Sequence, residues 1–468
     1  MKIKHVPSSW LDHNGRRLDC GPYMSGAIEA RELLSKLKTM PLHKLTAGHG
    51  GGIYNGPQFV RNYVTDPEFG VPFLTTSSML HSDLSTLPLL RKADALSSKL
   101  RYLEIKEGMT LITCSGTIGR MAYSRKSMEG AWSNQDIMKV VANPDAILPG
   151  YLHAYLASRF GVPLIVSGTY GAVIQHIEPH HIADLPVPRL KEIEEQVHDL
   201  IQQAADELSE SSSLMVSATN SLFSDAGLNE SHNHEYLSDD KRQGWSESSF
   251  NAFSLRALNY DPRAKELWQA VSSIRHDLLG DLVDRSNFEG HIVFKRIDAD
   301  PEHGVMLVGQ RDAFHLRPEG RWISKKSIQG LGLQVPAGTT VIPCHGTLGE
   351  SELYCRAALV TPRTSEYAYS GDFYRCIPRE GAIASGYLFA FLRSRFAFRM
   401  IRSMSTGSKQ QYQHPVLMAN MPIPRLDDEK EQEIATMVDR AGYLRDHALE
   451  LEDQAVALVD RAIEEGGR

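Results

Sequence analysis

The sequence predicts a mixed α/β protein with two homologous domains, each followed by a long helix. Two observations support this fold class. Short motifs recur in the same order about 236 residues apart, and an uninterrupted helical pattern follows each copy. The chain has 468 residues, enough for two to four domains of roughly 100–200 residues each. Apolar residues make up 42% and charged residues 23%, as in an ordinary globular protein.

The repeat consists of three motifs that keep their order and have only small changes in spacing. The turn 114–119 (CSGTIG) recurs at 344–349 (CHGTLG), and 149–152 (PGYL) with Ser158-Arg159-Phe160 recurs at 385–388 (SGYL) with Ser394-Arg395-Phe396. The exit 185–190 (LPVPRL) with Glu195-Gln196 recurs at 421–426 (MPIPRL) with Glu431-Gln432. The period is far longer than that of a solenoid repeat, so we infer a duplicated domain.

Within each copy, hydrophobic runs and turn residues predict both strands and helices. We expect strands over 109–114, 137–141, 339–344 and 373–377, and helices over 151–160 and 387–398. The predicted domains are residues 1–190 and 249–426. The predicted helices that follow them are residues 191–224 and 427–465, with a polar linker at 225–248.

The two predicted long helices have apolar residues at steps of three, four or seven, the spacing of a coiled-coil seam. The seam positions are Val197, Ile201, Ala204, Leu208, Met215, Ala218 and Leu222, and Ile434, Met437, Ala441, Leu444, Ala448, Leu451, Ala455, Leu458 and Ala462. Two separate amphipathic helices, each on its own domain, would also fit this pattern. The narrow, alanine-rich second seam favours a helix as the partner.

The net charge of −7 hides two basic blocks. Residues 1–190 carry +5 and residues 249–426 carry +6, whereas 191–224, 225–248 and 427–468 carry −6, −4 and −8. This partition suits polyanion binding by the two blocks alone. Acidic, solvated helices that merely flank neutral domains are the alternative explanation.

Several classes of function lack their motifs in this sequence. No stretch approaches ~18 apolar residues, and the N-terminus has no apolar signal region. Five cysteines without a CxxC pair predict a reducing compartment and no zinc ribbon. A glycine-rich cofactor loop, a methyltransferase tetrapeptide, a P-loop and HExxH are absent, so we expect no catalytic site, bound cofactor or metal.

Three other chemical roles are conceivable for residues of this sequence. His176, His180 and His181 cluster in the first copy, but Tyr412, Val416 and Leu417 replace them in the second, which argues against a metal site. Cys114 and Cys344 could be paired nucleophiles, although a cysteine that ends a strand is more often a core residue. The Gly-Thr-x-Gly turns could cradle a phosphate or could simply be tight turns; both interpretations stay open.

Basic and amide side chains near predicted loops are the candidates for DNA contact, because they can bond base edges and phosphates. The loop 167–172 with Gln175 and His176 aligns with the loop around Gly407, and the two differ in sequence as two readers of different half-sites would. The candidates in the first copy are Arg91, Lys92, Arg101, Arg120, Arg125, Gln175 and His176. Those in the second are Arg311, Arg317, Lys325, Lys326, Arg402, Lys409, Gln410 and Gln411.

The duplicated turns 115–119 and 345–349 and the duplicated proline exits before heptad helices resemble the DNA-specificity (S) subunit of type I restriction–modification systems. The resemblance covers nearly the whole chain. It implies two mixed α/β target-recognition domains, each binding one half of a split double-stranded DNA site. It also implies that the two long helices pair as an antiparallel coiled coil.

The resemblance further implies partners and a cellular setting. A non-catalytic S subunit binds two methyltransferase (M) subunits, which hold S-adenosylmethionine and methylate adenine, and restriction/translocation (R) subunits. A DNA-associated protein of the bacterial or archaeal cytoplasm, without a membrane partner, is expected. The alternatives are a recognition or interaction scaffold of another defence or DNA-processing complex, and an enzyme that uses Cys114 or Cys344.

Overall fold

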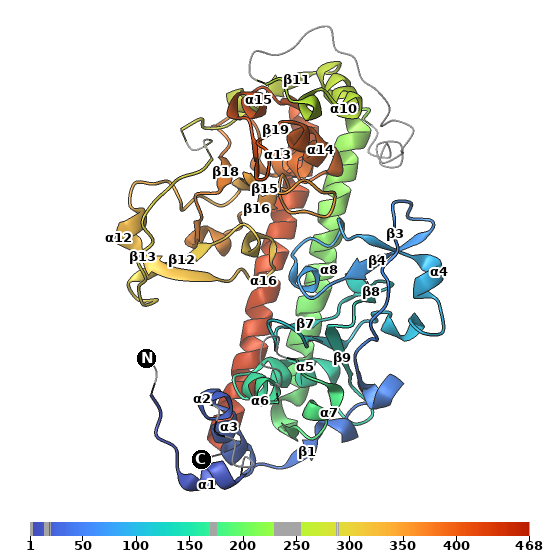
Figure 1. Cartoon of the computed structure of the whole chain (residues 1–468), viewed down its shortest axis with the longest axis vertical. Helices are drawn as coiled ribbons and strands as arrows, with labels where there is room; N and C mark the ends of the chain where they lie inside the picture. The colour runs from blue at the N-terminus through green and yellow to red at the C-terminus, as the bar shows by residue number, and fades with distance from the viewer. Residues whose placement is uncertain are drawn as a thin grey trace. The chain divides into compact units, whose positions relative to one another are not determined.

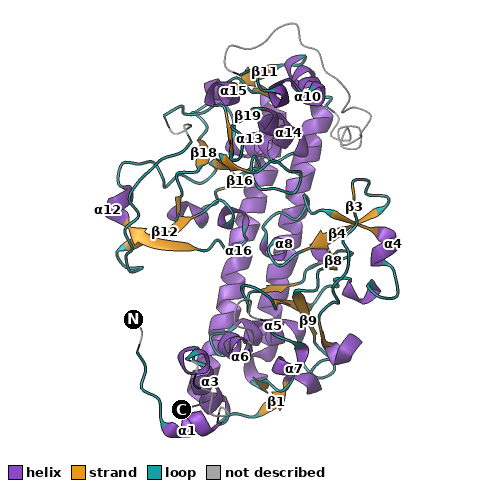
Figure 2. Cartoon of the chain, in the orientation of Figure 1, coloured by secondary structure: helices purple, strands orange, loops and turns teal. Residues whose placement is uncertain are grey.

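The computed structural model describes residues 3–13, 18, 20–168, 176–228, 254–286, 288 and 290–467. It has the mixed α/β character that the sequence predicts, with short strands and two long helices (Figures 1 and 2). The chain forms two compact units. The first contains Met1–Leu80, Leu89–Ser209 and His447–Arg468, and the second contains His81–Pro88 and Glu210–Asp446. The domain limits drawn from the sequence stay predictions.

The described residues of the first unit form three small sheets. The largest two have the strand orders β2-β9-β6-β7 and β3-β5-β4-β8, and β1 pairs with β10. Their bounds are β1 (Thr39–Pro41), β2 (Ile53–Tyr54), β3 (Tyr63–Val64), β4 (Gly70–Leu74), β5 (Leu89–Arg91), β6 (Met109–Thr113), β7 (Met121–Tyr123), β8 (Trp132–Ser133), β9 (Ile137–Val141) and β10 (Pro186–Pro188). The helices before the long helix are α1 (Ser8–His13), α2 (Gly21–Met24), α3 (Ala27–Leu34), α4 (Lys92–Ala95), α5 (Pro149–Ala157), α6 (Gly161–Ser167) and α7 (Pro179–Ile182).

The second unit repeats several of these pairings and adds a sheet of its own, β15-β20-β19. Its sheets have the orders β13-β12-β17, β16-β14-β18, β11-β21 and β15-β20-β19. The strands are β11 (His276–Leu278), β12 (Gly304–Val308), β13 (Gly320–Ser324), β14 (Thr340–Pro343), β15 (His345–Gly346), β16 (Ala358–Leu359), β17 (Ala368–Tyr369), β18 (Phe373–Cys376), β19 (Ser405–Thr406), β20 (Gln411–Gln413) and β21 (Pro422–Pro424). The helices are α10 (Pro262–Ser272), α11 (Leu279–Leu282), α12 (Lys325–Ile328), α13 (Ser385–Leu392), α14 (Arg395–Ser403) and α15 (Pro415–Ala419).

The duplication extends to strand direction. In the first unit β4 is antiparallel to β5 and parallel to β8, and in the second β12 is antiparallel to β13 and parallel to β17. The central strands β6 and β14 each pair with two antiparallel neighbours. A parallel pair needs a long crossover connection, so its recurrence supports a duplicated domain.

The sequence prediction of one helix over 387–398 is wrong, because that segment forms α13 and α14. The break is at Ser394, whose extended backbone ends the first helix and whose side chain accepts a hydrogen bond of 3.0 Å from the N–H of Ala397. In the first unit, Ser158 lies between α5 and α6 and accepts a bond of 3.0 Å from the N–H of Gly161. In each unit the serine of the repeated Ser-Arg-Phe motif therefore binds a backbone N–H at the start of the next helix, and in the second unit it is the N-cap of that helix.

The two long helices are α8 (Lys191–Asp225) and α16 (Asp428–Gly466) (Figure 1). In the second unit they pack antiparallel: the Ser211 hydroxyl donates a hydrogen bond of 2.7 Å to the Ala441 carbonyl, while Asp225 lies 3.5 Å from Lys430. In the first unit, Val197 and Ile201 share one core with Val459 and Ile463. These contacts confirm that the helices pair, as the seam predicts.

The predicted seam positions of α16 are correct over most of its length and wrong at its C-terminal end. Ala441, Leu444, Ala448, Leu451 and Ala455 are buried, but Val459 and Ile463 take the place of Leu458 and Ala462. A 3.6-residue helix drifts relative to a strict 3.5-residue repeat, which moves the buried stripe by one position. Of the predicted linker 225–248, residues 229–248 lie outside the described residues.

The repeated Gly-Tyr-Leu motif begins a helix of each unit, α5 or α13. It connects that helix to the proline-bordered strand, β10 or β21, that precedes the long helix. Tyr151 donates a hydrogen bond of 2.7 Å to the carbonyl of Pro188, and Tyr387 donates one of 2.9 Å to the carbonyl of Pro424. Each tyrosine thus fixes the proline-bordered exit strand. Among the described residues, no helix combines the length and apolar character that crossing a bilayer needs.

Candidate nucleic-acid interface

In both units the repeated turn motif lies beside the polar loop that the sequence analysis singled out. Ser115, the second residue of the first turn, forms an antiparallel bridge with His176. In the second unit His345, the second residue of its turn, pairs with Tyr412 in β20. These are equivalent positions of the repeat, so the same backbone pairing joins the turn to the loop in each unit.

The first turn is closed by the side chain of Thr113 at the end of β6. Its hydroxyl donates to the Thr117 carbonyl at 2.6 Å and accepts from the Arg120 N–H at 3.1 Å. Gly116 has a φ of +74°, a conformation that favours glycine, and a Cβ there would meet nothing within 4 Å. The structure therefore has the tight turn, with its outer face open, and a phosphate-binding role for it stays a prediction.

The second turn has the same sequence pattern but a different conformation. Pro343 stands where the first unit has Thr113, and proline offers neither a hydroxyl nor an N–H to close the turn. The chain continues instead as β15, which pairs with β20 (His345 with Tyr412, Gly346 with Gln411). The second turn is thus built into a three-stranded sheet with the loop hairpin.

The loop of the second unit is the hairpin β19–β20, whose turn contains Gly407 at a φ of +89°. Lys409 and Gln410 are exposed in this turn. Gln411 is buried, and its side chain accepts from Arg256 and donates to the carbonyl of Ser408. Arg256 also donates to the Gly407 carbonyl at 2.8 Å. Gln411 and Arg256 therefore support the hairpin from within, while Lys409 and Gln410 face solvent.

Arg402 forms an ion pair of 2.5 Å with Glu350, the residue that follows the second turn. Arg399 lies 3.4 Å from the same carboxylate. Burial alone would raise the pKa of Glu350, but the two guanidinium groups hold it below its usual range. Arg402 thus braces the turn against α14, and its side chain is mostly buried.

The other candidates lie on separate parts of each unit. Arg91, at the end of β5, pairs with Asp94 at 2.6 Å, and Lys92 begins α4. Arg120 follows the first turn, and Arg125 is buried, which lowers its pKa to about 10. The other exposed candidates are Arg101 near α4, Arg311 and Arg317 after β12, and Lys325 and Lys326 of α12. The two lysines of α12 line a cavity of about 410 Å³ together with Gln334. Gln175 lies outside the described residues.

Burial argues against a nucleophilic role for the paired cysteines. Cys114 and Cys344 are each 3% exposed. Desolvation raises the pKa of each thiol to about 12, whereas a cysteine nucleophile needs a pKa near or below neutrality. Their place at the ends of β6 and β14 is that of core residues, as the commoner interpretation expected.

Sequence reasoning missed two features of this interface. Arg256 is far from the hairpin in the chain, and no motif marks it as a support for Gly407. Tyr412 is exposed between two buried glutamines, and the sequence marks it only as the residue that replaces a histidine of the first copy. Its alternation with Gln411 and Gln413 was a visible strand signal, since side chains of a strand alternate between two faces.

No protein-family model matches the chain. No curated protein matches it either. Among solved structures, it is similar to the type I restriction–modification S subunit from M. genitalium, at 12% identity over 92% of this chain and 94% of that chain, with a TM-score of 0.33.

Two further solved structures show a similar level of likeness. The HsdS subunit from Thermoanaerobacter tengcongensis shares 12% identity over 92% of this chain and 96% of that one, with a TM-score of 0.25. A structure described as the basis of complex assembly and conformational transition of the type I R-M system shares 12% identity over 92% of this chain and 97% of that one, with a TM-score of 0.26. TM-scores this low do not establish a common fold.

Proposed function

We propose that this chain is the sequence-specific DNA-binding subunit of a type I restriction–modification system. Each unit reads one half of a bipartite double-stranded target, and the chain directs its partners to that target. The observation that supports this most is the repeated backbone pairing, Ser115 with His176 and His345 with Tyr412, beside loops of different sequence. Two domains that recognise different half-sites need the same backbone structure with loops of different sequence.

The side chains of the second loop suit base recognition. Lys409 and Gln410 are exposed at the hairpin turn, and lysine and glutamine bond guanine and adenine edges in the major groove. A two-stranded ribbon is narrow enough to enter that groove. Arg256 and Gln411 hold the hairpin from its base, so the exposed pair is presented on a supported element.

The charge pattern favours DNA at the domains rather than at the long helices. Residues 1–190 and 249–426 are basic, at +5 and +6, whereas the ranges 191–224 and 427–468 are acidic. Phosphates are attracted to the former and repelled by the latter. The acidic helices are therefore free to meet protein partners.

The partners follow from the family that the sequence resembles. We infer that two methyltransferase subunits bring S-adenosylmethionine and methylate adenine, and that restriction/translocation subunits cut. The chain itself is non-catalytic and binds no S-adenosylmethionine, and it acts on DNA in the cytoplasm. Its two best-placed thiols are buried and protonated, which fits this role.

Long-read methylation mapping tests the proposal in cells with and without the gene. A bipartite motif with methyladenine in both halves should be present in the first strain and absent in the second. Identical methylomes, together with DNA binding by the purified chain, would instead favour a scaffold of another DNA-processing complex. Identical methylomes without DNA binding would overturn the recognition role altogether.

A further inference from the structure

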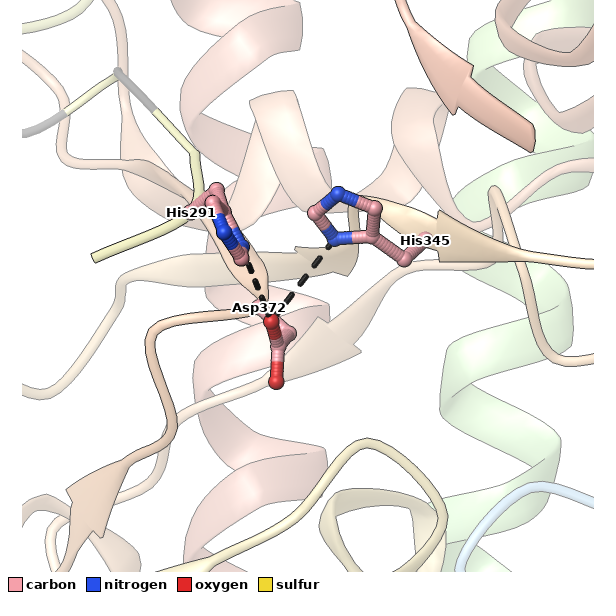
Figure 3. A group of neighbouring side chains, drawn as sticks. All are labelled: His291, His345 and Asp372. Carbon is pink, nitrogen blue, oxygen red and sulfur yellow. Dashed lines mark hydrogen bonds and ion pairs between the residues drawn. The ribbon is translucent and has the colours of Figure 1, made fainter. Parts of the chain in front are cut away.

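Three metal-ligating side chains meet in the second unit at the base of the hairpin. They are His291 from the loop before β12, His345 of β15 and Asp372, the residue before β18 (Figure 3). His291 Nδ1 lies 3.3 Å from Asp372 Oδ1, and His345 Nδ1 lies 3.7 Å from the same oxygen. One potential ligand atom of each residue lies within 4.8 Å of the other two.

These distances fit a common metal ion. In a tetrahedral site with bonds of ~2.0–2.1 Å, ligand atoms lie ~3.3 Å apart. The distances from Asp372 Oδ1 to the Nδ1 atoms of His291 and His345 are already at or near this length. Imidazole and carboxylate are ligands for zinc, iron(II), nickel and copper, so the set favours a divalent transition metal over magnesium or calcium.

The backbone around the cluster holds its residues in place. The carbonyl of Asp372 accepts hydrogen bonds from the Cys344 N–H at 2.9 Å and from the Gln310 side chain at 2.7 Å. The N–H of Ile292 donates to the carbonyl of Gly371 at 2.8 Å. A Cβ on Gly371 would lie 1.8 Å from the Ile292 carbonyl oxygen, so only glycine allows the two segments to come this close.

His291 itself has a φ of +68°, which a residue with a Cβ adopts rarely. Such a conformation is strained and persists where its surroundings impose it. Here it turns the imidazole toward Asp372 (Figure 3). A pre-set ligand on a strained backbone is common at functional sites.

The first unit has the same frame without the histidines. Asp136 accepts from the Cys114 N–H at 2.9 Å, as Asp372 does from Cys344. Ser115 follows Cys114 where His345 follows Cys344. The side chain of Asn55 lies by Cys114, and His291, at the equivalent position of the repeat, lies by Cys344 with its backbone. The two histidines therefore distinguish the second unit from a frame that otherwise recurs.

We propose that His291, His345 and Asp372 bind one divalent transition-metal ion of the zinc class. The side chains of His291 and Asp372 are 57% and 36% exposed, so the remaining coordination positions are open to water. The ion would join three chain segments beneath the hairpin that carries Lys409. This site does not depend on the proposed DNA-binding role, because it is defined by its ligands alone.

Cobalt(II) titration of the full chain tests the site, with the affinity tag removed and metals stripped by a chelator. The wild-type chain should bind one equivalent with the visible bands of nitrogen and oxygen ligation. The variant H291N/H345S carries the first unit's residues on the same frame, so it should fold and lose this equivalent. The control H276N/H303N removes two other histidines of this unit and should keep it.

Thermal unfolding supplies a second measurement. Zinc should raise the midpoint of the wild-type chain and of H276N/H303N, but not that of H291N/H345S, because an ion that binds only the folded state stabilises it. Two histidines that merely donate hydrogen bonds to Asp372 would give no difference between the three proteins, which overturns the proposal. A thiolate-to-cobalt band would overturn this ligand set in favour of one that includes Cys344.

Discussion

A Cβ atom on Gly386 would lie 2.6 Å from the carbonyl oxygen of Ala435, which belongs to α16. Real Cβ atoms do not approach backbone this closely, so the glycine lets α13 pack directly on the long helix. Gly150 has the same relation to α8, where a Cβ would lie 2.9 Å from the carbonyl oxygen of His198. The repeated Gly-Tyr-Leu motif is therefore a helix-packing motif, with the tyrosine bound to the exit strand.

Substitution G386A should destabilise the second unit. The added methyl must push α13 away from α16, and overpacking of this kind costs about 1–3 kcal/mol. Urea unfolding of the full chain measures the loss. Gly442, inside α16, is the matched control, because a Cβ there would lie 3.6 Å from Thr361 in ordinary contact. G442A should stabilise by about 0.5–1 kcal/mol through helix propensity. Equal effects of the two changes would refute the packing role.

Lys139 gives the first unit a pH dependence on the alkaline side. It is fully buried in β9, and its ammonium donates a hydrogen bond of 2.9 Å to the Ile137 carbonyl. Desolvation lowers the pKa of Lys139 to about 7. The unfolded chain therefore holds more protons than the folded chain between pH 7 and the ordinary lysine value near ~10.4. Stability from this group rises with pH over that window, and its penalty is fully present below pH 7.

The substitution K139M removes this titration. The free energy of unfolding of the wild type should increase relative to K139M as pH rises from 7 toward 10, by about 1–4 kcal/mol. Chemical denaturation at several pH values measures the difference. Arg375 occupies the equivalent place in the second unit, so K139R is a control that keeps a cation there. It should not follow the wild-type curve, because desolvation lowers the pKa of the equivalent Arg375 only to about 10, so an arginine there stays protonated over most of this range. Parallel curves for wild type and K139M would contradict a depressed lysine pKa.

The double substitution K409A/Q410A tests the hairpin as a DNA reader. Loss of a base-reading side chain should cost about 1–3 kcal/mol of binding and relax one half-site only. Binding to randomised duplexes, followed by sequencing, reports both quantities. The control K265A/Q269A removes an exposed lysine and glutamine from α10 and should leave the half-site unchanged. Unaltered affinity and preference in K409A/Q410A would remove the hairpin from the interface.

Gln411 should behave differently from its neighbours Lys409 and Gln410. Its buried side chain bonds Arg256 and Ser408, so Q411A should loosen the hairpin and lower the stability of the second unit. Removal of one buried partner leaves the other unsatisfied, at about 1–3 kcal/mol. The sequence could not separate these three residues, because their exposure is set by the pairing of β20 with β15 and β19.

The repeat predicted the strands β6, β9, β14 and β18 because apolar runs and turns are local signals. It could not predict what depends on three-dimensional contacts. The predicted pair Glu195 and Glu431 is an example. The structure uses Glu194, which accepts from Arg189 at 2.9 Å, as Glu431 accepts from Arg425 at 3.0 Å. Glu194 and Glu431 are each the fourth residue of their helix, so helix position decides which acid reaches the arginine.

The candidate site was predictable in part for the same reason. Alignment of the turns and loops located the polar loops, and both loop ends lie next to the turns. The exchange of Thr113 for Pro343 is visible in the sequence, yet the strand β15 that replaces a closed turn is not. Burial of Arg125, Arg402 and Gln411 also follows from packing between distant segments, so their charge or amide group alone suggested surface contacts that the structure uses internally.

The long helices carry the final prediction, that they set the spacing of the two half-sites. α8 passes from the first unit to the second between Ser209 and Glu210, and α16 returns between Asp446 and His447. Four residues inserted at both points add about 6 Å of helix. At ~3.4 Å per base pair, this lengthens the nonspecific spacer by about two base pairs. The half-sites themselves should not change, because neither reading loop is altered. Insertion in α8 alone should abolish methylation, since α8 is then longer than α16 between the two units. The pairing of Ser211 with Ala441 in the second unit and that of Val197 with Val459 in the first cannot then both be kept. Methylome sequencing of the variant tests this prediction. An unchanged spacer would show that the helices do not set the distance between the half-sites, and altered half-sites would show that spacing and recognition are not separate.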